Sequence, residues 1–202
     1  SVGASASMVE GLLAAVAVLV AGLVGWRAVD VRNANRAWRQ LAARQPTAPK
    51  SFDPGAIAHL PEPARRFFGF AIEPGTPLYP VAEISMQGEI GLGSRQRPNY
   101  RSMRALQISA PPYGFVWRVS AGRWLRIAGS DGATDDTSWS RFWLGGIVPV
   151  GRAGGDADHF RSAFGRCIAE AVFWAPAALL PAAGVLWEQT GEDSARVTLA
   201  RN

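Results

Sequence analysis

Three polar residues in the C-terminal half of the chain have the types and spacing needed to bind a ligand. Ser162, Arg166 and Glu170 lie at positions i, i+4 and i+8, so they share one face of a helix that contains them. If that face meets solvent, Arg166 and Glu170 form a surface ion pair that contributes about 0.3 kcal/mol. If it meets a sheet, the same residues can orient the headgroup of a ligand.

The residues around Ser130 do not complete a catalytic or calcium-binding motif. The segment Gly129-Ser-Asp-Gly132 is one residue short of the Gly-x-Ser-x-Gly elbow that positions a nucleophilic serine, and it is typical of a turn. Asp131, Asp135 and Asp136 offer carboxylates, but their spacing differs from the alternating positions of a calcium loop. We therefore expect a solvated loop.

Histidine and cysteine are too sparse for a metal site. His59 and His159 lie far apart, with no Cys or Glu at ligand spacing. Cys167, the single cysteine, falls within an apolar helical pattern and is expected to be a small buried residue rather than a nucleophile. The sequence predicts no catalytic residue, no metal and no cofactor.

Tryptophan is frequent in the C-terminal part of the chain, at Trp117, Trp124, Trp139, Trp143, Trp174 and Trp187. Aromatic side chains dominate ordinary cores, so core packing is the default expectation. The alternative is a concave apolar pocket lined by some of these rings, with Trp117 and Trp143 as the candidate ligand contacts.

An uncharged apolar run from Gly11 to Trp26 indicates a membrane anchor. At 1.5 Å per residue this run spans roughly 24 Å, and flanking apolar residues extend it toward the ~30 Å of a bilayer core. We expect a transmembrane helix over residues 9–29, after a disordered segment at 1–8. A cleaved signal peptide needs a basic segment before the run, and residues 1–7 contain no Lys or Arg.

The residues after the run predict how the helix sits in the membrane. Trp26 and Arg27 lie where an interfacial ring and a snorkelling guanidinium belong. Arg32, Arg36 and Arg39 continue the basic flank at the membrane interface. Because Lys and Arg accumulate on the cytoplasmic side of a span, we expect a single-pass protein with its C-terminal domain in the cytoplasm.

A basic amphipathic helix is expected directly after the span, over residues 30–45. Val31, Ala34, Trp38 and Leu41 recur at helical spacing, with the arginines off that stripe. Such a helix can lie on anionic headgroups, where each Arg contributes about 1 kcal/mol. Its apolar stripe can equally pack on the domain as a stalk.

The expected partners are membrane lipids, an apolar small molecule and a second copy of the chain. Ala17, Ala21 and Gly25 recur every fourth residue and would let two transmembrane helices form a homodimer, although small residues are simply common in this run. The net charge of +5 resides largely in residues 27–44, and the rest of the chain is near neutral. Nucleic acid is therefore not an expected partner.

The remaining chain predicts one α+β domain at 60–202, after a proline-rich linker at 46–59. A short helix is expected from about residue 60 and the main helix at 156–174. Strands are expected at 81–93, 100–110, 115–119, 124–127, 139–144, 185–190 and 195–200. This order predicts a curved antiparallel sheet with one main helix packed on it.

Several segments together resemble a known family. They are Leu60-Pro-Glu-Pro-Ala-Arg-Arg-Phe67, Ala110-Pro-Pro-Tyr-Gly-Phe-Val-Trp117, Gly129-Ser-Asp-Gly132, Arg161-Ser-Ala-Phe-Gly-Arg166 with Glu170-Ala171, and Pro176-Ala-Ala-Leu-Leu-Pro181. From about residue 55 to its end, the chain resembles a family of uncharacterised, membrane-anchored bacterial proteins with a domain of unknown function. The resemblance implies a C-terminally truncated member located in the bacterial inner membrane.

The resemblance also implies a binding role. The family's sheet is similar to the curved, lipid-cradling sheets of lipoprotein carriers, which is a likeness of fold alone. Ser162, Arg166 and Glu170 fall in a matching segment together with Arg161. These four residues are therefore the implied polar ligand contacts.

Three functions are compatible with these observations. The first is a non-catalytic, membrane-anchored module that binds an apolar ligand such as a lipid. The second is an enzyme that acts on lipid-like substrates and uses Asp131, Arg166 or Glu170. A carboxylate beside a cleft with a raised pKa would support this second function. The third is a structural or assembly subunit that acts through its helix and basic arm. The lack of a catalytic motif favours the first.

Overall fold

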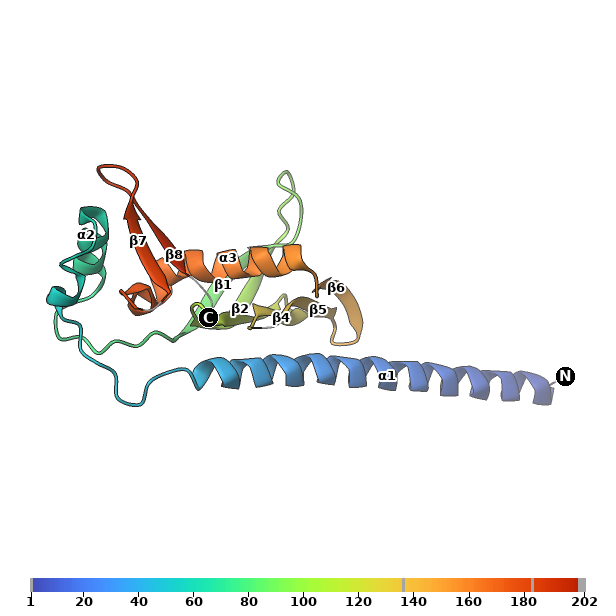
Figure 1. Ribbon diagram of the computed structural model, residues 1–202. Coiled ribbons are helices and arrows are strands. Elements are labelled where there is room, and N and C mark those ends of the chain that lie inside the picture. The colour runs from blue at the N-terminus through green and yellow to red at the C-terminus, as the bar shows by residue number, and fades with distance from the viewer. Residues whose placement is uncertain (1, 136, 183, 200–202) are drawn as a thin grey trace.

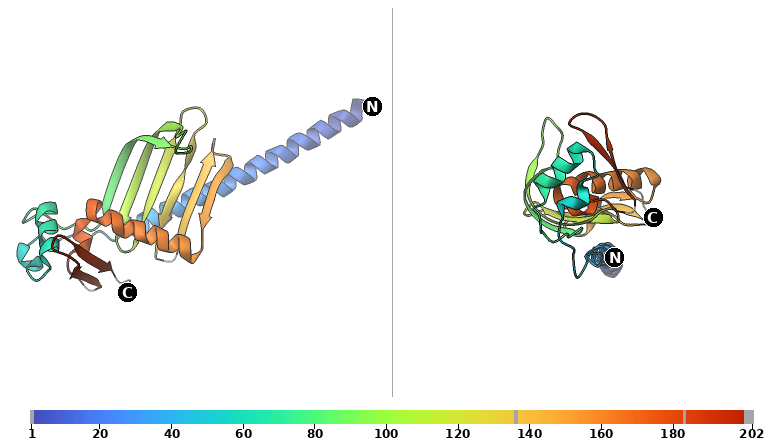
Figure 2. Two further views of the ribbon diagram at one scale, coloured as in Figure 1. Left: turned by 90° about the horizontal axis from the view of Figure 1, so that it is seen from above. Right: turned by 60° about the vertical axis from the view of Figure 1, so that its left-hand side comes forward.

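A six-stranded antiparallel sheet is the centre of the structure (Figure 1). The computed structural model describes residues 2–135, 137–182 and 184–199. The strands are β1 (Ala82–Gly91), β2 (Tyr100–Ala110), β3 (Gly114–Ala121), β4 (Ile127–Ala133), β5 (Ser138–Leu144) and β6 (Val148–Gly154). Each strand pairs with the next along the chain, and the sheet curves without closing (Figure 2).

Two long helices lie on opposite faces of this sheet, which confirms the predicted α+β class (Figures 1 and 2). The helix α3 (Ala157–Trp174) packs on the concave face, where Ala163 and Cys167 contact Phe115 and Ala133. Asp156 caps α3 by accepting a hydrogen bond from the His159 amide at 2.8 Å. This cap starts the helix at the position that the sequence predicts.

The helix α1 (Val2–Ala42) is continuous and lies along the convex face with its C-terminal part. It includes residues 2–8, for which disorder was expected, and it joins the expected segments 9–29 and 30–45 into one helix. No proline interrupts this stretch, so nothing local stops the helix. Among the described residues, α1 is the one helix long and apolar enough to cross a membrane, with a mean hydropathy of 2.3 in its most apolar window.

The apolar stripe of α1 packs on the domain, which decides between the two arrangements expected for residues 30–45. The buried residues of this interface are Ala34, Ala37 and Leu41 from α1, and Val81, Ile108, Ala110, Val116 and Trp139. Trp38 adds a hydrogen bond from Nε1 to Glu83 at 3.1 Å. Arg32, Arg36 and Arg39 remain exposed on the other side of the helix.

A small lobe closes one end of the molecule and includes part of the expected linker. It consists of η1 (Pro54–Ile57), α2 (Glu62–Ala71), η2 (Pro176–Leu179) and the separate hairpin β7 (Val185–Gln189) and β8 (Ala195–Leu199). Phe52 and Ile57 are buried against Phe68 and Leu179 in its core. The segment 46–59 is therefore partly a folded element and not simply a linker.

Two local predictions in the sheet are wrong. Gly129–Gly132 is not a turn but the middle of β4. The β3–β4 turn covers 122–126, so residues 124–126 lie in this turn although a strand was expected at 124–127. The glycines serve close packing, because a Cβ on Gly132 would come within 2.7 Å of the Trp139 ring. The strand β6 was not expected, since glycine and proline disfavour strands, and its pairing with β5 supplies the stability that propensity lacks.

Candidate functional site

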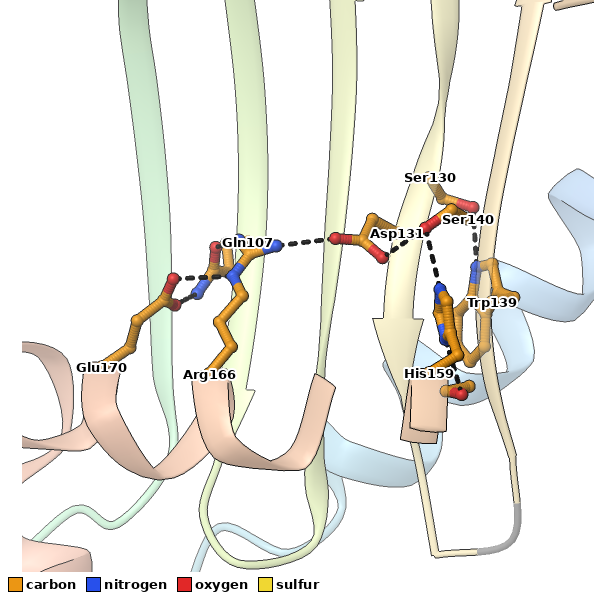
Figure 3. Close-up of polar contacts among 9 residues, drawn as sticks. Gln107, Ser130, Asp131, Trp139, Ser140, His159, Arg166 and Glu170 are labelled. Atoms are coloured by element: carbon orange, nitrogen blue, oxygen red, sulfur yellow. Dashed lines mark hydrogen bonds and ion pairs between the residues drawn. The ribbon is translucent and has the colours of Figure 1, made fainter. Parts of the chain in front are cut away.

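Alternate positions of the central strands place a polar row on the concave face, beneath α3. The register pairs Gln107 with Trp117, Trp117 with Asp131, and Asp131 with Ser140. Side chains at paired positions project from the same face of a sheet. These residues therefore form one line across β2 to β5. Figure 3 shows Gln107, Asp131 and Ser140 of this line together with the side chains of α3 that contact them.

Arg166 of α3 is the centre of this row. Its guanidinium donates from Nη1 to Asp131 Oδ2 at 2.7 Å, from Nε to Glu170 Oε1 at 2.7 Å, and from Nη2 to Gln107 Oε1 at 3.2 Å. Gln107 in turn donates from Nε2 to Glu170 Oε2 at 2.6 Å (Figure 3). The guanidinium also lies 4.5 Å from the centroid of the Phe115 ring. Arg166 thus ties α3 to two strands.

The charges of this cluster are balanced within it. The side chains of Arg166, Asp131 and Glu170 are 33%, 21% and 27% exposed, so the ion pairs are partly shielded from water. One guanidinium faces two carboxylates, so the formal charges of Arg166, Asp131 and Glu170 sum to −1. It therefore presents no spare positive charge to an anionic headgroup.

His159 continues the row towards β5. Ser140 Oγ lies 3.0 Å from Asp131 Oδ1 and 3.2 Å from His159 Nε2, and His159 Nδ1 lies 2.7 Å from Ser138 Oγ (Figure 3). Since Ser140 gives its one proton to the carboxylate, His159 Nε2 must be a donor. Ser138 is only 3% exposed, so a substrate has no access to it as a nucleophile. Together these contacts link His159 of α3 to β5 and, through Ser140, to Asp131 of β4.

The structure brings together only some of the predicted ligand contacts. Arg166, Glu170 and Trp117 lie at the concave face, and the rings of Trp117 and Phe142 meet edge-on with their centroids 6.5 Å apart. Arg161 is on the outer side of α3, paired with Asp158 at 2.8 Å. Ser162 is also exposed, because successive positions four apart drift around the helix. It does not join the cluster.

Trp143 lies on the opposite, convex face, where it contacts α1. Its indole Nε1 donates to Asp30 Oδ2 at 3.0 Å, and its ring meets the Trp26 ring edge-on at 5.5 Å. Asp30 also accepts from Arg152 Nη1 at 2.6 Å and pairs with Arg141 at 3.3 Å. We call the group formed by Asp30, Arg141, Trp143 and Arg152 the Asp30 clamp. Trp143 and Arg166 therefore lie on opposite faces of the sheet.

The electrostatics of the clamp favour the ionised form of Asp30. Its side chain is only 6% exposed. Burial alone raises its pKa, but hydrogen bonds from Arg152 and Trp143 and the charges of Arg152 and Arg141 outweigh this, so the pKa of Asp30 lies below its ordinary value. The clamp is thus a charged contact that fixes α1 on the sheet.

Cys167 lies on the side of α3 that faces the sheet and is buried there, as the sequence predicts. It is 0% exposed, and burial, with a smaller effect from the Glu170 charge, raises the pKa of its thiol to about 12. A thiol with such a pKa is protonated at neutral pH and is a poor nucleophile.

Two further rows on the concave face are apolar and lie beyond α3. The first row is Met86, Ala105, Val119, Gly129, Phe142 and Gly151, and the second is Gly88, Met103, Ala121, Ile127, Leu144 and Val148. We call them the apolar rows. Large residues alternate with glycine and alanine along the first row, whereas the second row ends in three successive large residues, Ile127, Leu144 and Val148. The helix α3 crosses the strands at the other end (Figure 2). This part of the face is free of a covering helix among the described residues.

Sequence reasoning missed Asp30, Gln107 and the role of His159. Asp30 is the only acidic residue between Glu10 and Asp53, and it stands among arginines, which could have marked it. Gln107 occupies an inward position in the alternating pattern of β2, where a polar side chain requires a partner. No local pattern marks His159, because its partners lie on β5.

The fold and site define a class of α+β protein in which a curved antiparallel sheet is held between a long apolar N-terminal helix and a second helix. A family of unknown function, DUF6544, matches residues 50–202, and the chain belongs to that family. Comparison with curated proteins and with solved structures found no match.

Proposed function

We propose that this protein is a non-catalytic module that is anchored in a membrane through α1 and binds an apolar ligand, such as a lipid chain, on the apolar rows. The observation that carries the proposal is the uncovered apolar part of the concave face. Met86, Met103, Phe142 and Leu144 are half-buried there. No helix within the described part of the chain covers this part of the sheet (Figure 2). An apolar chain laid on them would remove the remaining surface from water.

The neighbouring polar cluster limits the kind of ligand. Arg166 is engaged by Asp131, Glu170 and Gln107, so it stabilises the end of the face rather than binding an anion. Small residues such as Ala121 and Gly129 leave shallow depressions in the concave face between the larger side chains. Both features favour an extended, uncharged chain over a charged headgroup at this position.

Met103→Glu is expected to lower the fraction of protein that carries a ligand by at least about tenfold, because a carboxylate replaces the large apolar side chain that β2 contributes to the second row. The full chain would be released from detergent micelles and its bound mass recorded by native mass spectrometry. We expect the unsubstituted chain to retain one lipid-sized mass.

Leu106→Glu is the matched control. Leu106 lies on the same strand, 50% exposed, but on the convex face. Both variants keep α1, so lipids that adhere to the anchor are present in both. A bare mass for the unsubstituted chain, or equal retention by the two variants, would count against the proposal.

A further inference from the structure

Three hairpin turns of the sheet lie at the end where α1 leaves it. In an antiparallel meander, the turns β1–β2, β3–β4 and β5–β6 share one end, and they cover residues 92–99, 122–126 and 145–147. Arg27 of α1 lies against the last turn, since a Cβ on Gly146 would come within 2.9 Å of Nη1. From there, the apolar part of α1 projects past the sheet (Figure 2).

Large apolar side chains are exposed on these turns and beside them. Trp124 is 94% exposed and Leu125 73% exposed on the β3–β4 turn. Leu92 on the first turn, and Ile147 and Val148 at the third, are also exposed. Scattered apolar residues are normal on a surface, but a group at one end marks an interaction site.

The same turns are basic. Arg95, Arg97, Arg123 and Arg126 are exposed, and the three turns contain no Asp or Glu. In the described part of the chain, none of these four guanidinium groups is in an ion pair. The turn between β4 and β5, at the other end, instead carries an acidic residue, Asp135, which pairs with Arg44. Positive charge is thus concentrated at the end from which α1 projects.

We propose that the three turns, which we call the hairpin tips, dock on the anionic surface of the bilayer that α1 crosses. Trp124 and Leu125 would enter the headgroup region, and the arginines would contact lipid phosphates. The bilayer is the expected partner because α1 leaves the domain beside the tips. An inserted α1 therefore keeps the tips close to one membrane surface, which gives them a high effective concentration there. The inference rests on the membrane anchoring in the proposed function, but not on ligand binding.

The consequence concerns the apolar rows. A groove of about 730 Å³ lies at the tips, lined in part by Trp124 and Leu125 and in part by Ala121, Ile127 and Leu144 of the second apolar row. Docking of the tips therefore places an end of the apolar face against the bilayer. A lipid chain would reach the face without crossing water.

The test is a spin label at position 125 in the full chain. Leu125→Cys is compared with Phe70→Cys, which is 94% exposed on α2 in the small lobe. The native Cys167 is buried and does not compete for the label. Both proteins are reconstituted in vesicles of phosphatidylcholine with phosphatidylglycerol. Collisions of the label with oxygen, which concentrates in bilayers, are compared with collisions with a water-soluble nickel chelate.

We expect the ratio of oxygen to nickel collisions to be several-fold higher at position 125 than at position 70. Each arginine-to-glutamine change in the tips should lower the ratio of docked to undocked protein about fivefold in these vesicles, and high salt should act in the same direction. Vesicle flotation checks separately that α1 remains inserted. Equal ratios at the two positions in floated vesicles would overturn the proposal. The tips would then be a candidate surface for a protein partner.

Discussion

Replacement of Asp30 by alanine is expected to lower the free energy of unfolding by about 3 kcal/mol and to release α1 from the sheet. The change removes two hydrogen bonds from Arg152, one from Trp143 and the ion pair with Arg141. Breaking a buried charge pair costs ~3–5 kcal/mol. The arginine side chains are 28% and 29% exposed and can regain water, which places the effect at the low end.

The loss of Asp30 also leaves the indole N–H of Trp143 without an acceptor. Trp143 is 2% exposed, so water cannot easily replace the carboxylate. Urea unfolding of the full chain in a mild detergent measures the change in stability. The rate of trypsin cleavage measures the release of α1 from the sheet. Trypsin cuts after Arg32, Arg36 and Arg39, and these sites resist cleavage while the helix is held on the sheet.

Asn33→Ala is the matched control, since Asn33 is exposed on the same helix. We expect its unfolding free energy to stay within about 0.5 kcal/mol of the unsubstituted chain. If Asp30→Ala behaves like Asn33→Ala in both assays, the Asp30 clamp does not hold α1.

The clamp also has a predicted pH dependence. The pKa of Asp30 is lowered in the folded protein, so the carboxylate contributes stability above its unfolded pKa of about 3.9. That contribution is lost as the pH falls through the lower, folded value. The stability difference between the unsubstituted chain and Asp30→Ala should therefore be constant above about pH 5 and shrink in stronger acid.

Arg166→Met is expected to lower the free energy of unfolding by about 2–3 kcal/mol. Methionine keeps much of the side-chain volume, but it leaves Asp131 and Glu170 facing each other without the guanidinium, and Gln107 without a donor. Removing one partner of a shielded pair costs ~3–5 kcal/mol, and the partial exposure of this cluster reduces that value. Urea unfolding of the full chain measures it.

Arg161→Met is the control for this prediction, because it makes the same change on the outer side of α3. Arg161 and Asp158 are 78% and 83% exposed, so their ion pair should contribute less than about 0.5 kcal/mol. Equal stability of the two variants would contradict the role of Arg166 in holding α3 on the sheet. The unfolding free energy of Arg166→Lys should lie between those of Arg166→Met and the unsubstituted chain. The lysine ammonium keeps the positive charge but cannot donate to several partners with the planar geometry of a guanidinium.

Much of the fold could be predicted because its patterns are local. The alternation in β1, the capped start of α3 at Asp156 and the proline at the start of α2 each depend on neighbours in the chain. The candidate site was only half predicted. The pairing of Arg166 with Glu170 follows from spacing within one helix, whereas its contacts with Asp131 and Gln107 depend on the strand register.

By itself, the sequence determined the elements of this protein: an apolar N-terminal helix, a meander of strands and a second helix with a polar face. Only the tertiary structure decided what those faces meet. Asp30 is 113 residues from Trp143 and 122 from Arg152, and Gly129–Gly132 forms a strand because it pairs with β3 on one side and β5 on the other. Periodicity and capping act within a few residues, while the choice of partners depends on how distant segments pack, which no local pattern records.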